Sequence, residues 1–111
     1  MNAGDRVRLE HMLHAASEAL SFAAGRARPD LERDRMLLLS VVKEIEIIGE
    51  AAVRVSAECW AELPGIPWAA VIGTRNRLTH AYFDWNLDIV WATLTSDLPV
   101  LIGQLRRALS D

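Results

Sequence analysis

Apolar residues recur every three or four positions along four stretches of the chain, which is the spacing of one face of an α-helix. These stretches cover residues 9–23, 38–55, 68–78 and 87–109. No segment shows the extended period-two alternation of a half-buried strand, and no Asn-Gly or Asp-Gly hairpin turn occurs. The pattern predicts an all-α fold in which four helices with short connections form an antiparallel, up-and-down bundle.

Polar residues that favour helix starts lie just before these stretches. Asp5 and Asp30 are placed to cap the first and second helices, and Asp84 or Asn86 is placed to cap the fourth. Each side chain would accept a hydrogen bond from a backbone N–H of the first turn. These positions predict the helix boundaries.

Proline and glycine refine this picture. The stretch Ser56–Leu63 leaves room for a short extra helix between the second and third helices, ended by Pro64-Gly65. Pro67 suits the first turn of the third helix, which should end near His80–Phe83. Pro99 lies inside the fourth apolar stretch, so we expect a kink about one turn before it.

Length and composition indicate one domain, residues 1–111, with enough apolar residues (51%) for a packed core. The single cysteine, Cys59, rules out an internal disulfide framework and fits a reducing, cytoplasmic location. The polar segment Met1–Glu10 does not resemble a signal peptide, and the charges within Met36–Val55 exclude a membrane span there.

The formal net charge of −3 excludes a globally basic nucleic-acid binder, but a local basic site remains open. No acidic residue occurs between Glu62 and Asp84, whereas Arg75, Arg77 and His80 lie within that window. The charge distribution therefore directs attention to the end of the third predicted helix.

The segment 74–83 brings together the groups that can process a phosphodiester without a metal. An imidazole such as His80 can exchange a proton with a ribose hydroxyl near neutral pH, and a guanidinium such as Arg75 can stabilise charge on phosphoryl oxygens. Five residues separate the two, which puts them about 140° apart on a regular helix. On spacing alone, a helix-end histidine with a solvated arginine is favoured, unless the helix ends there or two chains share a cleft.

The order Arg75-x4-His80-x-Tyr82 resembles the R-x4-H-x-Y motif of HepT-like toxins, a branch of the HEPN superfamily of small helical ribonucleases. The surrounding sequence is also similar, from the first helix to the fourth. The similar stretches are Ile48-Gly49-Glu50-Ala51-Ala52, Ile66-Pro67-Trp68, Ile72–Leu78, His80–Asp84, Asp88–Trp91 and Asp97-Leu98-Pro99.

The resemblance implies a HEPN-like bundle that forms a homodimer and cleaves RNA without a metal or cofactor, with arginine and histidine of both protomers lining one cleft. His80 would be the general acid or base, and Arg75 would bind the scissile phosphate. Asn76 would orient one of them or contact the phosphate, and Arg77 would bind RNA. Attack of the ribose 2′-OH on its own phosphate would leave a cyclic phosphate and a free 5′-OH.

Tyr82 is the one tyrosine of the chain. In systems that this sequence resembles, a minimal nucleotidyltransferase antitoxin of the MntA type transfers AMP to the tyrosine of the motif. Added negative charge there would repel RNA and occupy Arg75. The alternative, compatible with the first, is that the ring packs against the fourth helix with its hydroxyl at the surface.

Four further features carry weaker signals. His11 and His14 share a helix face and would supply half of a metal site, although a solvated face is favoured. Glu50 is either a partner that holds an arginine such as Arg75, or a solvated glutamate. The loop 26–28 would extend an RNA track or be merely solvated. Cys59 has no visible activating neighbour.

Two rival functions stay open at this point. The chain could be a non-catalytic helical dimer that docks a nucleotidyltransferase, because a motif can persist after activity is lost. It could also bind a small ligand between its helices, which would require a polar cavity that the apolar stretches do not show.

Overall fold

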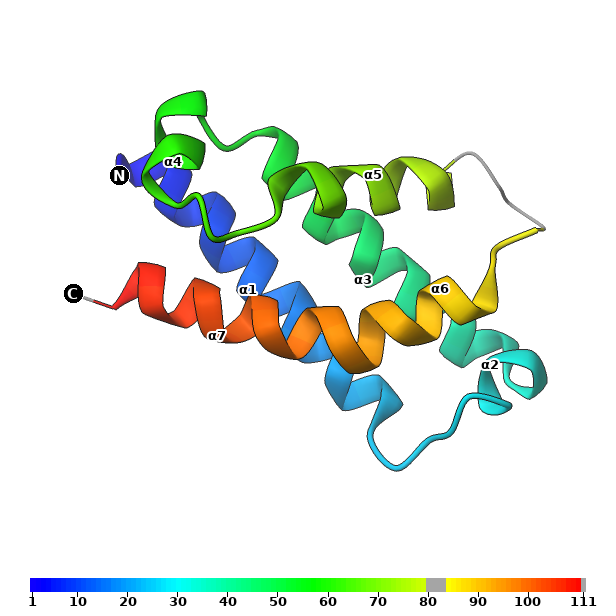
Figure 1. The fold of residues 1–111 in the computed structure, drawn as a ribbon. Helices are drawn as coiled ribbons and strands as arrows, with labels where there is room; N and C mark the ends of the chain where they lie inside the picture. Colours follow the sequence, from blue (N-terminus) through cyan, green and yellow to red (C-terminus); the bar gives the residue numbers. More distant parts are fainter. Residues whose placement is uncertain (80–83, 111) are drawn as a thin grey trace.

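The computed structural model describes residues 1–79 and 84–110, which form a bundle of helices (Figure 1). Four long segments run up and down, and two short helices lie in the connections (Figure 1). The long segments are α1 (Ala3–Ala23), α3 (Arg35–Val53), α5 (Trp68–Thr79) and the unbroken run of α6 (Leu87–Ala92), η1 (Thr93–Asp97) and α7 (Leu98–Leu109). The short helices are α2 (Asp30–Arg33) and α4 (Ala57–Glu62). The predicted all-α, antiparallel four-helix bundle is confirmed, including the short extra helix α4 before the third long one.

The core lies around α3, which packs against α1 on one side and against α5 on the other, while α1 also packs against α7. Apolar side chains at helical spacing fill these interfaces, as the sequence pattern predicts. The largest fully buried ones are Leu9, Met12, Leu31, Ile48, Leu94, Leu105, Val41, Val42 and Val90. α3 is therefore the central helix, against which both α1 and α5 pack.

Two predicted caps are wrong. Asn2, rather than Asp5, caps α1: its Oδ1 accepts the Asp5 N–H at 2.7 Å. Asp5 is instead buried, where its carboxylate accepts the N–H and hydroxyl of Ser56 at 2.9 and 2.7 Å. These two hydrogen bonds lower the pKa of Asp5 and join α1 to the start of α4.

The second helix also begins later than predicted. Asp30 starts the single turn α2, and Asp34 caps α3 by accepting the Leu37 N–H at 3.1 Å. Asn86 caps the fourth segment, as one of the two predicted alternatives. α5 starts at Trp68, so Pro67 stands just before its first helical residue instead of inside its first turn.

The kink predicted before Pro99 takes the form of a π-helical turn, η1. The Leu98 N–H reaches back five residues to the Thr93 carbonyl. Proline lacks the N–H of a regular α-helix, and its ring clashes with the carbonyl four residues earlier. The helix accommodates Pro99 by widening for one turn and then continues as α7.

No helix among residues 1–79 and 84–110 combines the length and apolarity that crossing a bilayer requires.

Candidate functional site

The candidate site is built where α3 and α5 cross. Gly49 on α3 lies directly beneath Arg75 on α5, and a Cβ added at Gly49 would overlap the Cβ and Cγ of Arg75. Glycine thus lets the two backbones approach closely, and the arginine side chain is laid across α3 at this point. The close approach of the two helices explains why glycine stands at position 49, within the stretch that resembles a family signature.

The Arg75 guanidinium is held by neighbours on both helices. Its Nη2 donates to Glu50 Oε1 across the interface, and its Nη1 donates to Asn76 Oδ1 at 2.6 Å. The Arg75 side chain is 24% exposed and that of Glu50 is 50% exposed, so the pair lies at the edge of solvent. Of the two interpretations of Glu50, the structure supports the one in which it pairs with Arg75.

This geometry leaves part of the guanidinium usable. Arg75 Nε is buried with no hydrogen-bond partner among the described residues. Nη1 and Nη2 each carry two hydrogens, and the contacts with Asn76 and Glu50 use one on each. A guanidinium with donors to spare can bind two oxygens of one phosphate.

The other motif residues fall into two groups. Asn76 and Arg77 are exposed on α5, and Arg77 Nη2 lies 3.4 Å from Thr74 Oγ1. His80 and Tyr82 lie outside the described residues, so their predicted roles as acid or base and as modification site stay predictions. The roles of Arg75, Asn76, Arg77 and Glu50 toward RNA also stay predictions.

Tryptophan N–H groups pin α5 at both ends. At its start, Trp68 Nε1 donates to the Leu63 carbonyl at 3.1 Å, and its ring stacks on Trp60 with centroids 5.7 Å apart. At its end, Trp85 Nε1 donates to the Leu78 carbonyl at 2.9 Å. These two hydrogen bonds and the stacked rings hold in place the helix that carries Arg75.

A cavity of about 390 Å³ opens on another face of α5, between α3 and the η1–α7 segment. Its lining is mainly apolar, and its polar residues include Thr74, Ser96 and Asp97. Gln104 also lines it, donates to the Gly65 carbonyl at 2.6 Å, and buries its Oε1 without a partner among the described residues. The apolar stretches did not indicate this space, because periodicity along one helix does not show whether two helices close a seam.

The weaker sequence candidates do not form a site. His11 and His14 are exposed on α1, and His14 Nε2 lies 3.5 Å from Glu18 Oε2. Within residues 1–79 and 84–110, no group of three or more His, Cys, Asp or Glu residues could hold a metal ion. Cys59 is buried, and burial raises the pKa of its thiol, which disfavours the reactive thiolate.

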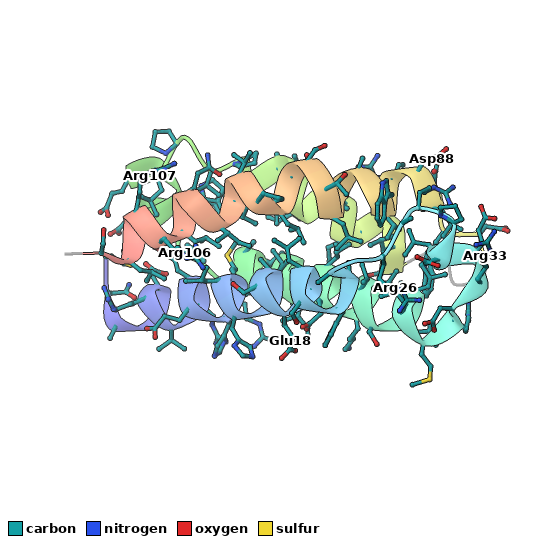
Figure 2. The ribbon with its side chains drawn as sticks, turned by 90° about the horizontal axis from the view of Figure 1, so that it is seen from below. Glu18, Arg26, Arg33, Asp88, Arg106 and Arg107 are labelled. Carbon is teal, nitrogen blue, oxygen red and sulfur yellow. The ribbon has the colours of Figure 1, made fainter. Side chains whose placement is uncertain are left out.

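The arginines of the 26–28 loop are engaged in structure. Arg26 pairs with Asp34 at 2.8 Å, and Arg28 pairs with Asp88 at 2.9 Å and with Glu32 at 3.1 Å. Figure 2 labels Arg26 and Asp88 at the same end of the bundle. The Arg28 pair connects the loop to α6, so an RNA track gains no support here.

Comparison with known proteins identifies the family of the chain. The model of the family described as ribonuclease HepT-like matches residues 12–108, a range that includes α3, α5 and the motif that begins at Arg75. No solved structure matches the chain.

Three relatives carry ribonuclease names. "Putative RNase TTE0752" of Caldanaerobacter subterraneus subsp. tengcongensis is 32% identical over 101 residues, which cover 91% of this chain and 90% of that protein. "Putative RNase MJ1380" of Methanocaldococcus jannaschii is 28% identical over 91 residues, 82% of this chain and 84% of that protein. "Probable ribonuclease HepT" of Thermococcus cleftensis is 32% identical over 74 residues, 67% of each chain. With a family match over most of its length and a guanidinium held at the α3–α5 crossing, this chain belongs to the HepT-like ribonuclease family.

Proposed function

We propose that this chain is a metal-independent ribonuclease that cleaves RNA at a composite site between two copies. One observation carries the proposal: Arg75, within the R-x4-H-x-Y motif, is fixed by Gly49 and Glu50 at the edge of solvent. A preorganised cation suits the charge that builds up on a phosphoryl group in the transition state.

The proposed reaction needs a base, an acid and a cation. A neutral His80 takes the proton from the ribose 2′-OH, whose oxygen attacks the adjacent phosphorus. A protonated His80, contributed by the second protomer, gives its proton to the departing 5′-oxygen. Arg75 balances the charge on the non-bridging oxygens, while Asn76 orients the guanidinium. The products are a 2′,3′-cyclic phosphate and a free 5′-OH.

Two features of the chain favour a homodimer. Arg75 and His80 point about 140° apart if α5 continues regularly, so residues of two protomers converge more readily than those of one. In addition, α3 exposes Met36 (80%), Leu39 (44%) and Val53 (47%) on the face that carries Glu50. A second copy covering these side chains would bring both copies of the Arg75 pair to the same interface.

The partner and regulation follow from the resemblance. We propose that the protein is the toxin of a HepT/MntA toxin–antitoxin system, and that an MntA-type nucleotidyltransferase transfers AMP to Tyr82. An AMP on this residue, two positions after His80, would bring a negative charge that competes with RNA for Arg75.

Cleavage of total RNA in the presence of EDTA tests the activity. Wild type should cut RNA, and Arg75→Ala and His80→Ala should lose at least about a hundredfold in rate. His11→Ala, which removes an exposed histidine of α1, is the matched control and should cut like wild type. Equal cleavage by wild type and His80→Ala would overturn the proposal, and an inactive wild type that still binds the nucleotidyltransferase would favour the non-catalytic alternative.

Intact-mass measurement tests the modification. After incubation with ATP and the nucleotidyltransferase, wild type should gain the mass of AMP and stop cutting RNA. A gain that persists in Tyr82→Phe would place the modification elsewhere and contradict the assignment.

A further inference from the structure

A second hollow is lined by residues of α2, α3 and α6 and by Trp85. These elements lie at the end of the bundle where α5 ends (Figure 1). The volume of the hollow is about 290 Å³, near the lower limit of about 300 Å³ for small-molecule pockets. The lining residues combine an apolar floor, one aromatic ring and two opposite charges; they are Leu31, Glu32, Arg35, Leu38, Trp85 and Leu87. None of these residues belongs to the candidate site at the α3–α5 crossing.

Arg35 and Trp85 lie against each other in this pocket. The Arg35 guanidinium carbon lies 5.6 Å from the centroid of the Trp85 ring, the geometry of a cation–π pair. The Trp85 ring is held in place because its Nε1 donates a hydrogen bond to the Leu78 carbonyl at 2.9 Å. The Arg35 side chain is exposed and lies over a ring that a hydrogen bond holds in place. A second planar group can therefore stack on the guanidinium from the solvent side.

Glu32 determines which planar group fits. One of its carboxylate oxygens accepts from Arg28 at 3.1 Å, and the side chain is 62% exposed beside the pocket. A carboxylate next to Arg35 repels a phosphate and attracts a hydrogen-bond donor. A planar ring with an exocyclic amino group, such as cytosine or adenine, satisfies the stacking surface and the carboxylate together.

The position of the pocket relates it to the cleavage site. Trp85 contacts Leu78, one helical turn beyond Arg75 on α5. Leu38 lines the pocket, and Glu50, which holds Arg75, follows twelve residues later on α3, about 18 Å along the helix axis. A single strand whose scissile phosphate lies on Arg75 therefore reaches the pocket within a few nucleotides.

We propose that the Arg35–Trp85–Glu32 pocket is a subsite that binds one amino-bearing base of single-stranded RNA a few nucleotides from the scissile phosphate. The inference rests on the proposed ribonuclease function and adds to it a determinant of substrate choice. The base stacks on the Arg35 guanidinium, and its amino group donates to Glu32.

Binding of non-cleavable RNA isolates this subsite from catalysis. Fluorescein-labelled 2′-O-methyl oligocytidylate and oligouridylate of equal length lack the attacking hydroxyl, and uracil lacks the exocyclic amino group. Fluorescence anisotropy should show that wild type binds the cytidine oligomer about tenfold more tightly than the uridine oligomer.

Two variants and one matched control define the outcome. Arg35→Ala should weaken binding of the cytidine oligomer about tenfold, and Glu32→Gln should reduce the cytidine-over-uridine preference to near one. Arg33, labelled in Figure 2, is exposed two residues away and is not among the residues that line the pocket. Arg33→Ala removes the same charge and should weaken binding less than about threefold. Equal losses in Arg35→Ala and Arg33→Ala would overturn the subsite, as would a wild type with no preference between the oligomers.

A competition arm separates RNA from free nucleotides, and a cleavage arm separates this inference from the proposed function. Cytidine monophosphate that displaces the oligomer at micromolar concentration would make the pocket a nucleotide site and overturn its assignment to RNA. Cleavage by wild type with no difference between Arg35→Ala and Arg33→Ala would overturn the subsite alone. Selective binding by a wild type that cuts no RNA would overturn the ribonuclease and leave the pocket assignment intact.

Discussion

Two glutamates six positions apart on α3 meet opposite environments at the two interfaces of that helix. Glu50 faces α5, is half-exposed, and accepts a hydrogen bond from the Arg75 guanidinium. Glu44 is 5% exposed, has an Oε2 without a partner among the described residues, and lies near Glu18 of α1. Burial, together with the neighbouring Glu18 carboxyl, raises the pKa of Glu44 to about 7.

The difference shows that position on the helix, not residue type, decides what a carboxyl does here. At the solvent edge, Glu50 accepts a hydrogen bond from Arg75 and orients its guanidinium. Between α1 and α3, with no cation in the interactions described for it, Glu44 holds its proton up to near neutral pH. The α3–α5 interface positions the candidate site, whereas the α1–α3 interface makes the stability of the fold depend on pH.

The largest expected effect comes from breaking the α5 interface. Gly49→Ala places a Cβ against the Arg75 side chain, so α5 or the arginine must shift. We expect unfolding free energy to fall by about 3 kcal/mol and RNA cleavage to be lost. Urea unfolding and the cleavage assay measure the two effects.

Gly73→Ala is the matched control for this change. Gly73 lies in α5 with open space where its Cβ would stand, and alanine favours a helix more than glycine does. This variant should be as stable as wild type or slightly more stable, and equal losses at Gly49 and Gly73 would contradict the close-approach explanation.

The next effect concerns the α1 interface and depends on pH. Between pH 4.5 and 7 the folded state keeps the Glu44 proton and the unfolded state releases it, so stability should fall as pH rises through this window and then level off. Glu44→Gln removes this titration and should exceed wild type by about 2 kcal/mol at pH 8, with little difference at pH 4.5. Urea unfolding across this range measures it, with Glu46→Gln as the control; a wild-type slope in Glu44→Gln would refute the assignment.

A smaller effect should follow from releasing Arg75 without disturbing the crossing. Glu50→Ala removes the carboxylate that holds the guanidinium, so the arginine samples more positions and cleavage should slow about tenfold, equivalent to about 1.4 kcal/mol of activation free energy. Because the pair is at the solvent edge, stability should change by less than about 1 kcal/mol. Faster cleavage would mean that Glu50 restrains Arg75 from its substrate.

The smallest effect is expected away from α3. Arg28→Ala removes pairs with Glu32 and Asp88 at the exposed end of the bundle, where solvent screens the charges. Cleavage by this variant should match wild type in the assay that detects Glu50→Ala. A comparable loss in Arg28→Ala would restore the RNA-track interpretation of the 26–28 loop.

The sequence by itself determined the helices and the family. Apolar spacing marked the four long segments, because burial of one helix face requires that period, and Pro99 located η1 because it lacks an N–H. The ordered motif from Arg75 to Tyr82 indicated the HepT-like family, which the family match confirms. These features depend on residues close together in the chain, which is why pattern alone revealed them.

The tertiary structure decided what distant residues do to one another. Asp5 does not cap α1, because its carboxylate accepts two hydrogen bonds from Ser56, which is fifty-one residues away in the sequence. Contacts between distant segments place Glu50 beside the Arg75 guanidinium, Glu44 near the Glu18 carboxyl, and Arg35 over the Trp85 ring. Such contacts depend on helix rotation and separation at each crossing, and those are set by the packing of all the helices together.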